Sequence, residues 1–257
     1  MKLALITDIH ANREAFEACL EQSHLHGAER IALLGDFVGY GADPGWVVDR
    51  VQDLVFQGAI AVRGNHDEAV AQAASLHLVE DARRVIDWTR ERLRPDQIAF
   101  LASLPMQRQE AGCLFVHANA YAPAAWEYVL GRIEAVRSLH ATDCRHTFCG
   151  HVHAPGLYHL SSTGKIADFS PTAGVAVPVP AHRQWLGLPG SAGQPRDGNP
   201  AAWQGLERRV FDFLTVKTAK GELSQPITLI AINEEAMAAL KQRLPWPRSR
   251  YADMINR

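Results

Sequence analysis

The chain has 257 residues, of which 47% are hydrophobic and 21% charged, and its formal net charge is −2. This composition is ordinary for a folded globular protein and excludes a mostly disordered chain. The near-neutral charge argues against a general basic coat for nucleic acid, and no apolar run reaches the roughly 20 residues that cross a bilayer.

The cysteines and the N-terminus indicate a cytoplasmic protein. Four cysteines occur, none in a C-x-x-C pair, which favours reduced and mostly buried thiols: Cys19, Cys113, Cys144 and Cys149. The first apolar run is short and ends in the carboxylate of Asp8, with no small-residue cleavage site behind it. We therefore expect a strand at this end of the chain rather than a signal peptide.

The first quarter of the chain alternates short apolar runs with helical spacing. The pattern predicts strands at 3–7, 31–34 and 60–62, with helices at 12–26 and 44–57 between them. We expect Asn12 to cap the first helix, Gly27 to stop it, and Pro44 to lie in the first turn of the second. The strand-helix-strand order predicts a layered α/β fold.

The remaining chain adds helices first and strands afterwards. Residues 68–104 have helical spacing with a break at Pro95, and a further helix is predicted at 133–139. Strands are predicted at 113–116, 147–149, 157–160, 184–188, 210–216 and 227–232. An amphipathic helix at 233–244 closes one expected domain over residues 1–244, followed by a loosely held tail at 245–257. The stretch 187–200 is expected to be a functional loop.

Polar side chains with metal-binding chemistry follow the ends of five predicted strands. They are Asp8 and His10, then Asp36, then Asn65 and His66, then His117, and finally His151 and His153. Because ligands bind beyond the carboxyl ends of the strands in α/β sheets, we expect these side chains to meet at one edge. Each motif alone is typical of an ordinary turn, but five in succession favour a site for two divalent metals.

The types of these side chains restrict the metal. Imidazole and carboxylate suit Mn, Fe, Zn or Ni, and the lack of thiolate argues against an iron–sulfur or structural zinc site. The other histidines are expected at the surface or in packing: His24, His26, His77, His140, His146, His159 and His182.

The motifs together resemble the calcineurin-like metallophosphoesterase superfamily. They are Asp8-x-His10, Gly35-Asp36, Gly64-Asn65-His66-Asp67, His117 and Gly150-His151-x-His153. The stretches 38–44 and 188–198 resemble the small bacterial branch, often described as diadenosine-tetraphosphatase or protein-phosphatase-like, although Leu188 stands where that branch usually has Asn. The resemblance implies an α/β fold, a four-layer α/β/β/α sandwich with two facing mixed sheets and a binuclear metal site at the carboxyl edge of the strands.

The resemblance also implies a role for each motif residue. One metal would be held by Asp8, His10, Asp36 and His153, and the other by Asp36, Asn65, His117 and His151, so that Asp36 bridges the pair. His66 would lie near the phosphate without binding metal, acting on the leaving oxygen or orienting a ligand. From the residues themselves, we expect Asp67 to cap a helix and Arg196 to bind phosphate or to pair with a carboxylate.

We therefore expect a metal-dependent hydrolase with a metal-bridging hydroxide as nucleophile. Its substrate would be a phosphodiester, a phosphomonoester or a dinucleoside polyphosphate. The substrate molecule would be a phosphorylated small molecule, a nucleotide or a phosphopeptide. A non-catalytic interaction module of the same fold is one alternative. A nuclease is another, but the arginines of 83–94 alternate with acidic residues, which indicates a solvated ion-paired face rather than a DNA site. A membrane is not an expected partner, and the sequence leaves the oligomeric state open.

Overall fold

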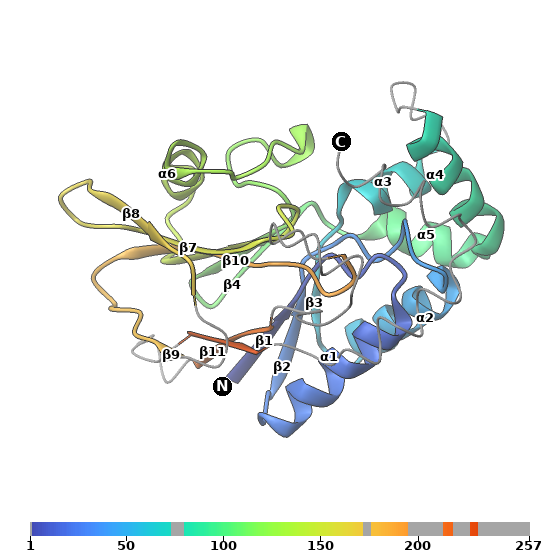
Figure 1. The fold of residues 1–257 in the computed structure, drawn as a ribbon, viewed down its shortest axis with the longest axis horizontal. Helices are drawn as coiled ribbons and strands as arrows, with labels where there is room; N and C mark the ends of the chain where they lie inside the picture. The colour runs from blue at the N-terminus through green and yellow to red at the C-terminus, as the bar shows by residue number, and fades with distance from the viewer. Residues whose placement is uncertain (1, 73–79, 172–175, 195–212, 218–226, 231–257) are drawn as a thin grey trace, which may run out of the picture.

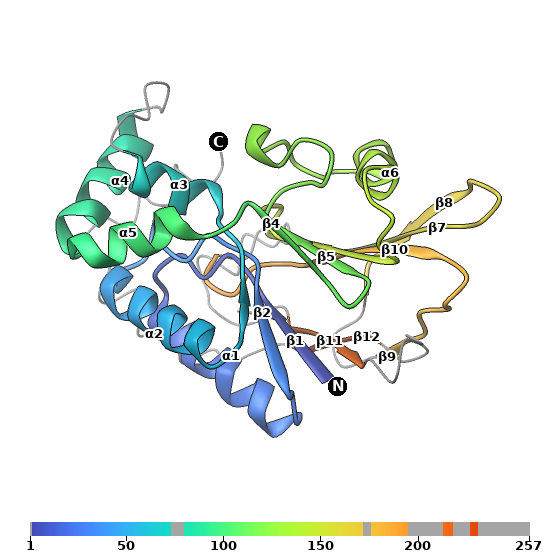
Figure 2. The ribbon, with the colours of Figure 1, turned by 180° about the vertical axis from the view of Figure 1, so that it is seen from behind.

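Two mixed β-sheets, each with six strands among the described residues, form the centre of the fold. The structure is a computed structural model that describes residues 2–72, 80–171, 176–194, 213–217 and 227–230. The sheets face one another, with α1 and α2 along the outer side of the first and α6 along the outer side of the second (Figures 1 and 2). This is the predicted α/β/β/α sandwich.

The first sheet has the strand order β3-β2-β1-β11-β12-β9. Its parallel part consists of β1 (Lys2–Ile6), β2 (Arg30–Leu33) and β3 (Ile60–Ala61), joined by helices α1 (Arg13–Leu25) and α2 (Pro44–Phe56). The antiparallel part is β11 (Phe213–Lys217), β12 (Ile227–Ile230) and β9 (Ala176–Val177). The three parallel strands therefore end at the same edge.

The second sheet has the order β4-β5-β6-β10-β7-β8. Strands β5 (Cys113–Val116), β6 (His146–Cys149) and β10 (Gln184–Pro189) are parallel. Strands β4 (Gln107–Glu110), β7 (Pro155–Leu160) and β8 (Ile166–Phe169) pair antiparallel to their neighbours. Its parallel strands bring the chain segments after Val116, Cys149 and Pro189 to one edge as well.

The remaining helices lie next to the ends of the first sheet or over the second. Helices α3 (Asn65–Ala71), α4 (Glu80–Arg92) and α5 (Pro95–Ser103) pack together, and α6 (Arg132–His140) follows a short 3₁₀ turn at Pro123–Ala125. Pro95 starts α5, as the predicted break requires. Helix α3 starts at Asn65, earlier than the predicted residue 68, and the Asp67 carboxylate stabilises this start by accepting a hydrogen bond from the Gly64 backbone at 2.9 Å. None of the described helices is long and apolar enough to cross a membrane.

Three apolar clusters fill the spaces between the four layers. One joins the first sheet to its helices and includes Ile6 and Phe16. A second joins the two sheets to each other, with Leu5 on one side and Phe115 on the other. The third lies between the second sheet and α6, and Leu139 belongs to it. The four cysteines are buried, as predicted. Burial of three apolar faces holds the strand ends of both sheets in fixed relative positions.

Most predicted elements occur within one to three residues of their expected ends, and three strands were missed. Asn12 caps α1 by accepting a hydrogen bond from the backbone of Ala15 at 3.0 Å. The missed strands are β4, β8 and β9, all of them at or next to the outer ends of their sheets. The predicted helix at 233–244 and the tail at 245–257 lie outside the described residues, and the single domain over 1–244 stays a prediction.

Candidate metal centre

The chain turns sharply where the strands end, and five of the expected metal-binding residues occupy those turns. Their backbone φ angles are positive: Asp8 at 53°, His10 at 49°, Asp36 at 53°, His151 at 68° and His153 at 60°. Residues other than glycine rarely adopt this left-handed backbone conformation, and those that do are concentrated at functional sites. At these residues the chain turns instead of continuing the strands, and all five belong to the clusters described below.

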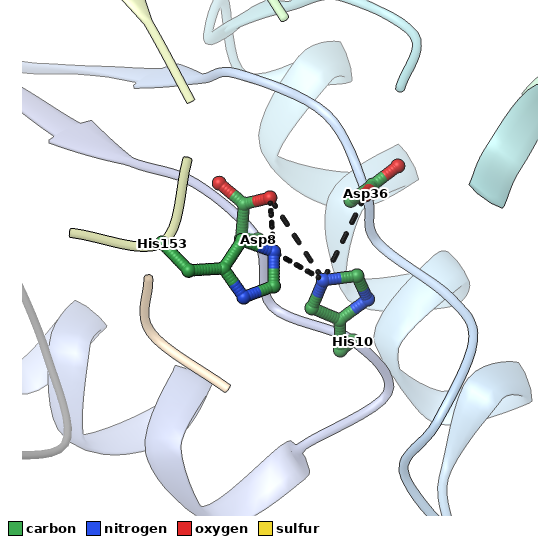
Figure 3. A group of neighbouring side chains, drawn as sticks. All are labelled: Asp8, His10, Asp36 and His153. Atoms are coloured by element: carbon green, nitrogen blue, oxygen red, sulfur yellow. Dashed lines mark hydrogen bonds and ion pairs between the residues drawn. The ribbon is translucent and has the colours of Figure 1, made fainter. Parts of the chain in front are cut away.

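Four of these side chains form a first buried cluster (Figure 3). The Nε2 atoms of His10 and His153 lie 3.1 Å apart. Asp8 Oδ1 is 3.0 Å from Nε2 of His153 and 3.8 Å from Nε2 of His10. Asp36 Oδ2 is 3.7 Å from the same His10 nitrogen. Two imidazole nitrogens and two carboxylate oxygens therefore converge on one point.

A second cluster shares Asp36 with the first. It contains Asp36, His117 and His151, all buried, with their candidate donor atoms within 4.8 Å of one another. His117 Nε2 lies 3.3 Å from Asp36 Oδ2 and 3.2 Å from Asn65 Oδ1. Asp36 Oδ2 thus stands between a histidine of each cluster, which is the position that a ligand shared by two cations requires.

Backbone carbonyls fix the tautomers of three histidines. The Nδ1 atoms of His10, His117 and His153 lie 3.2, 2.7 and 2.6 Å from the carbonyl oxygens of Val38, Leu34 and Gln194. A carbonyl can only accept, so each Nδ1 carries the hydrogen and donates it. The Nε2 atoms then face the clusters and can bind a cation once they carry no proton, which is how proteins orient metal-binding histidines.

His151 uses its two nitrogens in the opposite sense. Its Nε2 lies 2.9 Å from the carbonyl oxygen of Trp126, so that Nε2 carries the hydrogen and donates it. Nδ1 keeps its lone pair and is the atom that can bind a metal. The ring of Tyr128 stacks on the His151 ring with centroids 4.0 Å apart and an angle of 11° between the planes. The segment after β5 therefore contacts the His151 ring through both its carbonyl and its aromatic side chain.

Each carboxylate has one oxygen held by the protein and the other directed into the clusters. Asp8 Oδ2 accepts hydrogen bonds from the Thr7 hydroxyl at 2.7 Å and the His151 backbone at 3.0 Å. Asp8 Oδ1 is buried and accepts no hydrogen bond. Asp36 Oδ1 accepts from the His66 backbone at 2.9 Å. A buried carboxylate oxygen without a hydrogen bond, facing imidazole nitrogens, fits a divalent cation.

The charges of the cluster also suit cations. Burial opposes ionisation of Asp8 and Asp36, but His153 and His117 beside them hold the pKa of each carboxyl well below its usual range. Burial lowers the pKa of His10, and burial together with His117 lowers that of His151 to about 4. Burial would also lower the pKa of His117, but Asp36 outweighs it and raises the value to about 9. A cation at the second cluster would compete with that proton on His117.

Two glycines allow the close approach of backbone and carboxylates. A Cβ on Gly64 would lie 2.1 Å from Asp36 Oδ1, and one on Gly150 would lie 2.0 Å from the Thr7 hydroxyl and 2.6 Å from Asp8 Oδ2. No larger residue fits at either position without moving an aspartate.

The predicted residues outside the ligand set have different surroundings. The half-buried His66 belongs to neither cluster, and its ring centroid lies 4.9 Å from that of His10 and 4.5 Å from that of Tyr40. Asp67 lies inside α3 instead of at the expected N-cap, which is Gly64; its carboxylate accepts from the backbones of Gly64 and Phe37, both at 2.9 Å. Arg196 lies outside the described residues, so its role stays a prediction.

The start of the predicted loop at 187–200 is fastened to the Asp8 segment. The Ser191 hydroxyl and the Gly193 backbone both donate to the carbonyl of Asp8, at 2.9 and 2.8 Å. Leu188 is buried on β10 in the cluster beneath α6, so the position where the related branch has Asn is apolar here.

Several groups that build the site were not predicted. The carbonyls of Leu34, Val38, Trp126 and Gln194 orient the histidines, yet a backbone carbonyl leaves no trace in the sequence. Thr7 could have been noticed, because a hydroxyl directly beside an expected metal-binding carboxylate is well placed to orient it.

Comparisons with known proteins agree with this geometry. Residues 1–206 match the calcineurin-like phosphoesterase superfamily domain. The CHASE2 domain matches residues 191–257 and overlaps the first match. The uncharacterized protein MJ0912 of Methanocaldococcus jannaschii is 33% identical over 227 residues, which cover 84% of this chain and 86% of that protein.

Solved structures show the same fold over nearly the whole chain. A metallophosphoesterase from Sphaerobacter thermophilus has a TM-score of 0.76 and 28% identity, with 98% of this chain and 97% of that one covered. The hypothetical protein PH1004 from Pyrococcus horikoshii has a TM-score of 0.69 at 16% identity, covering 99% and 97%. With a family match over most of its length, this fold and a buried cluster of aspartates and histidines, the chain belongs to the calcineurin-like phosphoesterase superfamily, a family of hydrolases.

Proposed function

We propose that this protein is a binuclear metal-dependent phosphoester hydrolase. The observation that carries the proposal is the position of Asp36 Oδ2, which lies 3.7 Å from His10 Nε2 in one cluster and 3.3 Å from His117 Nε2 in the other. Asp8 and His153 would complete one metal position, and His151 with Asn65 the other. The mixture of imidazole, carboxylate and amide donors suits Mn, Fe, Zn or Ni.

A pair of divalent cations supplies, when bound, activation of a bridging water as the nucleophile and neutralisation of phosphoryl charge. The protein's own contribution is positioning. The carbonyls behind the histidines hold each ring in one tautomer, and Thr7 holds the Asp8 carboxylate in one orientation. Because these groups are fixed before substrate arrives, little reorganisation is needed during reaction.

His66 is the candidate general acid. Its ring lies beside His10 and outside both metal clusters, so it can face a phosphoryl group without binding a cation. The proton would pass from the imidazolium to the leaving oxygen of the ester, which typically gives about 10²–10⁴-fold in rate. Arg196 would add a bidentate contact to a phosphate oxygen pair. The substrate would be a phosphodiester, a phosphomonoester or a dinucleoside polyphosphate.

Reconstituted protein tests the function. Chain stripped with a chelator and loaded with Mn²⁺, Fe²⁺, Zn²⁺ or Ni²⁺ is assayed on a chromogenic diester, a chromogenic monoester, a dinucleoside polyphosphate and a phosphopeptide. We expect two ions per chain and turnover of at least one substrate. Absence of turnover together with absence of metal uptake would refute the proposal and favour an interaction module.

Variants separate the roles of the residues. Asp36→Asn should lose the paired ions and activity, because one oxygen serves both positions. His66→Ala should keep both ions and lower kcat by about 10²–10⁴-fold. His140→Ala, at an exposed histidine of α6, is the matched control and should change neither. Loss of both ions in His66→Ala would instead place His66 among the ligands.

A further inference from the structure

Three of the four carbonyls that orient the histidines, those of Val38, Trp126 and Gln194, lie in loops that a buried polar side chain holds by a hydrogen bond. Asp67 accepts from the backbone of Val38 at 3.3 Å, next to the carbonyl that holds His10. Ser191 accepts from the backbone of Gln194 at 2.9 Å, next to the carbonyl that holds His153. The equivalent tie for the carbonyl of Trp126 comes from Asn119.

Asn119 is fully buried, and its side chain joins two parts of the loop between β5 and α6. Its Nδ2 donates to the carbonyl of Glu127 at 2.8 Å, eight residues further along the chain. Its Oδ1 accepts from the backbone of Ala122 at 2.7 Å. The first bond reaches the residue directly after Trp126, so it fixes the segment that carries the carbonyl facing His151.

Trp126 needs such a constraint. Its φ is 55°, in the left-handed region, which is unfavourable for a bulky side chain. Strained conformations of this kind persist only where the surroundings over-determine them. The chain reversal at Trp126 is what directs its carbonyl toward Nε2 of His151 at 2.9 Å. Without the Asn119 tie, the residue could relax, and the carbonyl would leave the histidine.

We propose that Asn119 is a positioning residue of the metal centre, acting through the Trp126 carbonyl to keep Nδ1 of His151 free for the second metal. The inference rests on the proposed two-metal function. Asn119 acts through its two hydrogen bonds within the loop. The first cluster depends on the other two loops, so loss of the Asn119 tie should weaken one metal position and spare the other. Removal of a group that orients a metal-binding histidine typically lowers metal affinity 10–100-fold.

The test is a Mn²⁺ titration of chelator-stripped protein by calorimetry, with ion content measured after desalting. In Asn119→Ala we expect one of the two binding steps to lose about 10–100-fold in affinity, while the other stays within about twofold. Asn119→Asp keeps the acceptor for Ala122 but loses the donor to Glu127, so it should show the same selective loss with nearly unchanged volume.

Thr142→Ala is the matched control. The Thr142 hydroxyl accepts a backbone hydrogen bond from Cys144 at 3.1 Å in the loop at the other end of α6, so its loss is also the loss of a side-chain tie within a loop. Both binding steps should be unchanged in this variant. Thermal unfolding of each metal-free variant reports any general loss of stability.

Histidine-ring ¹⁵N NMR spectra of the metal-free proteins provide a readout that a merely structural role would not move. His151 should carry its hydrogen on Nε2 in the wild type and should populate both tautomers in Asn119→Asp. Equal weakening of both metal steps, or an unchanged tautomer with unchanged affinities, would overturn the proposal. If the wild type binds one ion, the two-metal function is refuted, and the ring spectra alone decide the role of Asn119.

Discussion

Part of the acid sensitivity of the fold should come from a buried histidine outside the metal clusters, His146. His146 starts β6 and is fully buried, and neither of its ring nitrogens has a hydrogen-bond partner. Burial, reinforced by the neighbouring Arg145, lowers the pKa of His146 to about 4 from the ordinary 6.5. The folded state therefore resists protonating a group that the unfolded chain protonates readily.

The sign and size follow from linkage. Above about pH 7 both states hold the neutral ring and His146 gives no pH dependence. As the pH falls from about 6.5 to about 4 the unfolded chain takes up the proton first, so the free energy of unfolding falls. Each pKa unit corresponds to about 1.4 kcal/mol, so the full loss approaches about 3 kcal/mol. Below about pH 4 both states are protonated and the loss stops growing.

The substitution His146→Phe removes the titrating ring and keeps an aromatic side chain. Urea unfolding of metal-free protein, repeated from pH 8 to pH 4, gives the free energy of unfolding for each variant. The wild type should lose about 3 kcal/mol more than His146→Phe across this range. The comparison uses the change with pH, because the larger ring can itself alter stability at neutral pH.

The same substitution at His140, an exposed residue at the end of α6, is the matched control and should follow the wild type. Parallel loss of stability in wild type and His146→Phe would refute the reasoning. It would mean that His146 is hydrated or hydrogen-bonded in solution and titrates near its ordinary pKa.

Three further predictions concern the metal centre. Asp67→Ala leaves without an acceptor the two backbone donors that lie 2.9 Å from the carboxylate. The loss of about 3 kcal/mol should lower the melting temperature by about 6–12 °C, whereas Asp53→Ala, at an exposed residue, should change the melting temperature little. Gly64→Ala places a Cβ 2.1 Å from Asp36 Oδ1 and should abolish binding of the paired ions, which elemental analysis measures. Ala at Gly131, also a helix N-cap in extended backbone but with nothing within 3.5 Å of the added carbon, should retain them. Mn²⁺ at a hundred times its Kd should raise the stability of the wild type by about 2.7 kcal/mol for each ion bound, and a chelator should reverse the gain. An unchanged melting temperature in Asp67→Ala would contradict the first argument. Two bound ions in Gly64→Ala would contradict the second, and a wild-type stability that does not respond to Mn²⁺ would contradict the third.

Much of the centre could be predicted because its side chains follow parallel strands directly. Asp8 and Asp36 come two or three residues after the last residues of β1 and β2, and His117 comes directly after β5. Parallel strands end at a common edge, so position along the chain translates into position in space. The layered fold followed from the same apolar runs, since each buried strand needs two covered faces.

The parts that could not be predicted depend on contacts between distant segments. Strand β4 has the sequence Gln-Arg-Gln-Glu, which carries no apolar signal because it lies at the edge of its sheet. His146 gives no hint of its burial, since it looks like any histidine near a strand. The carbonyls behind the histidines and the reach of Asn119 to Glu127 emerge only when the loops fold.

The place of β1 in the first sheet has a consequence for how the protein is made. Leu3 pairs with Arg30 on one side and with Val216 on the other. A ribosome must therefore synthesise some two hundred residues between the first strand and its second neighbour, while the open edge of that strand lacks this partner. Pairings so far apart in sequence form slowly, and an uncovered edge can recruit other chains. Low temperature or chaperones during expression should therefore raise the yield of folded protein.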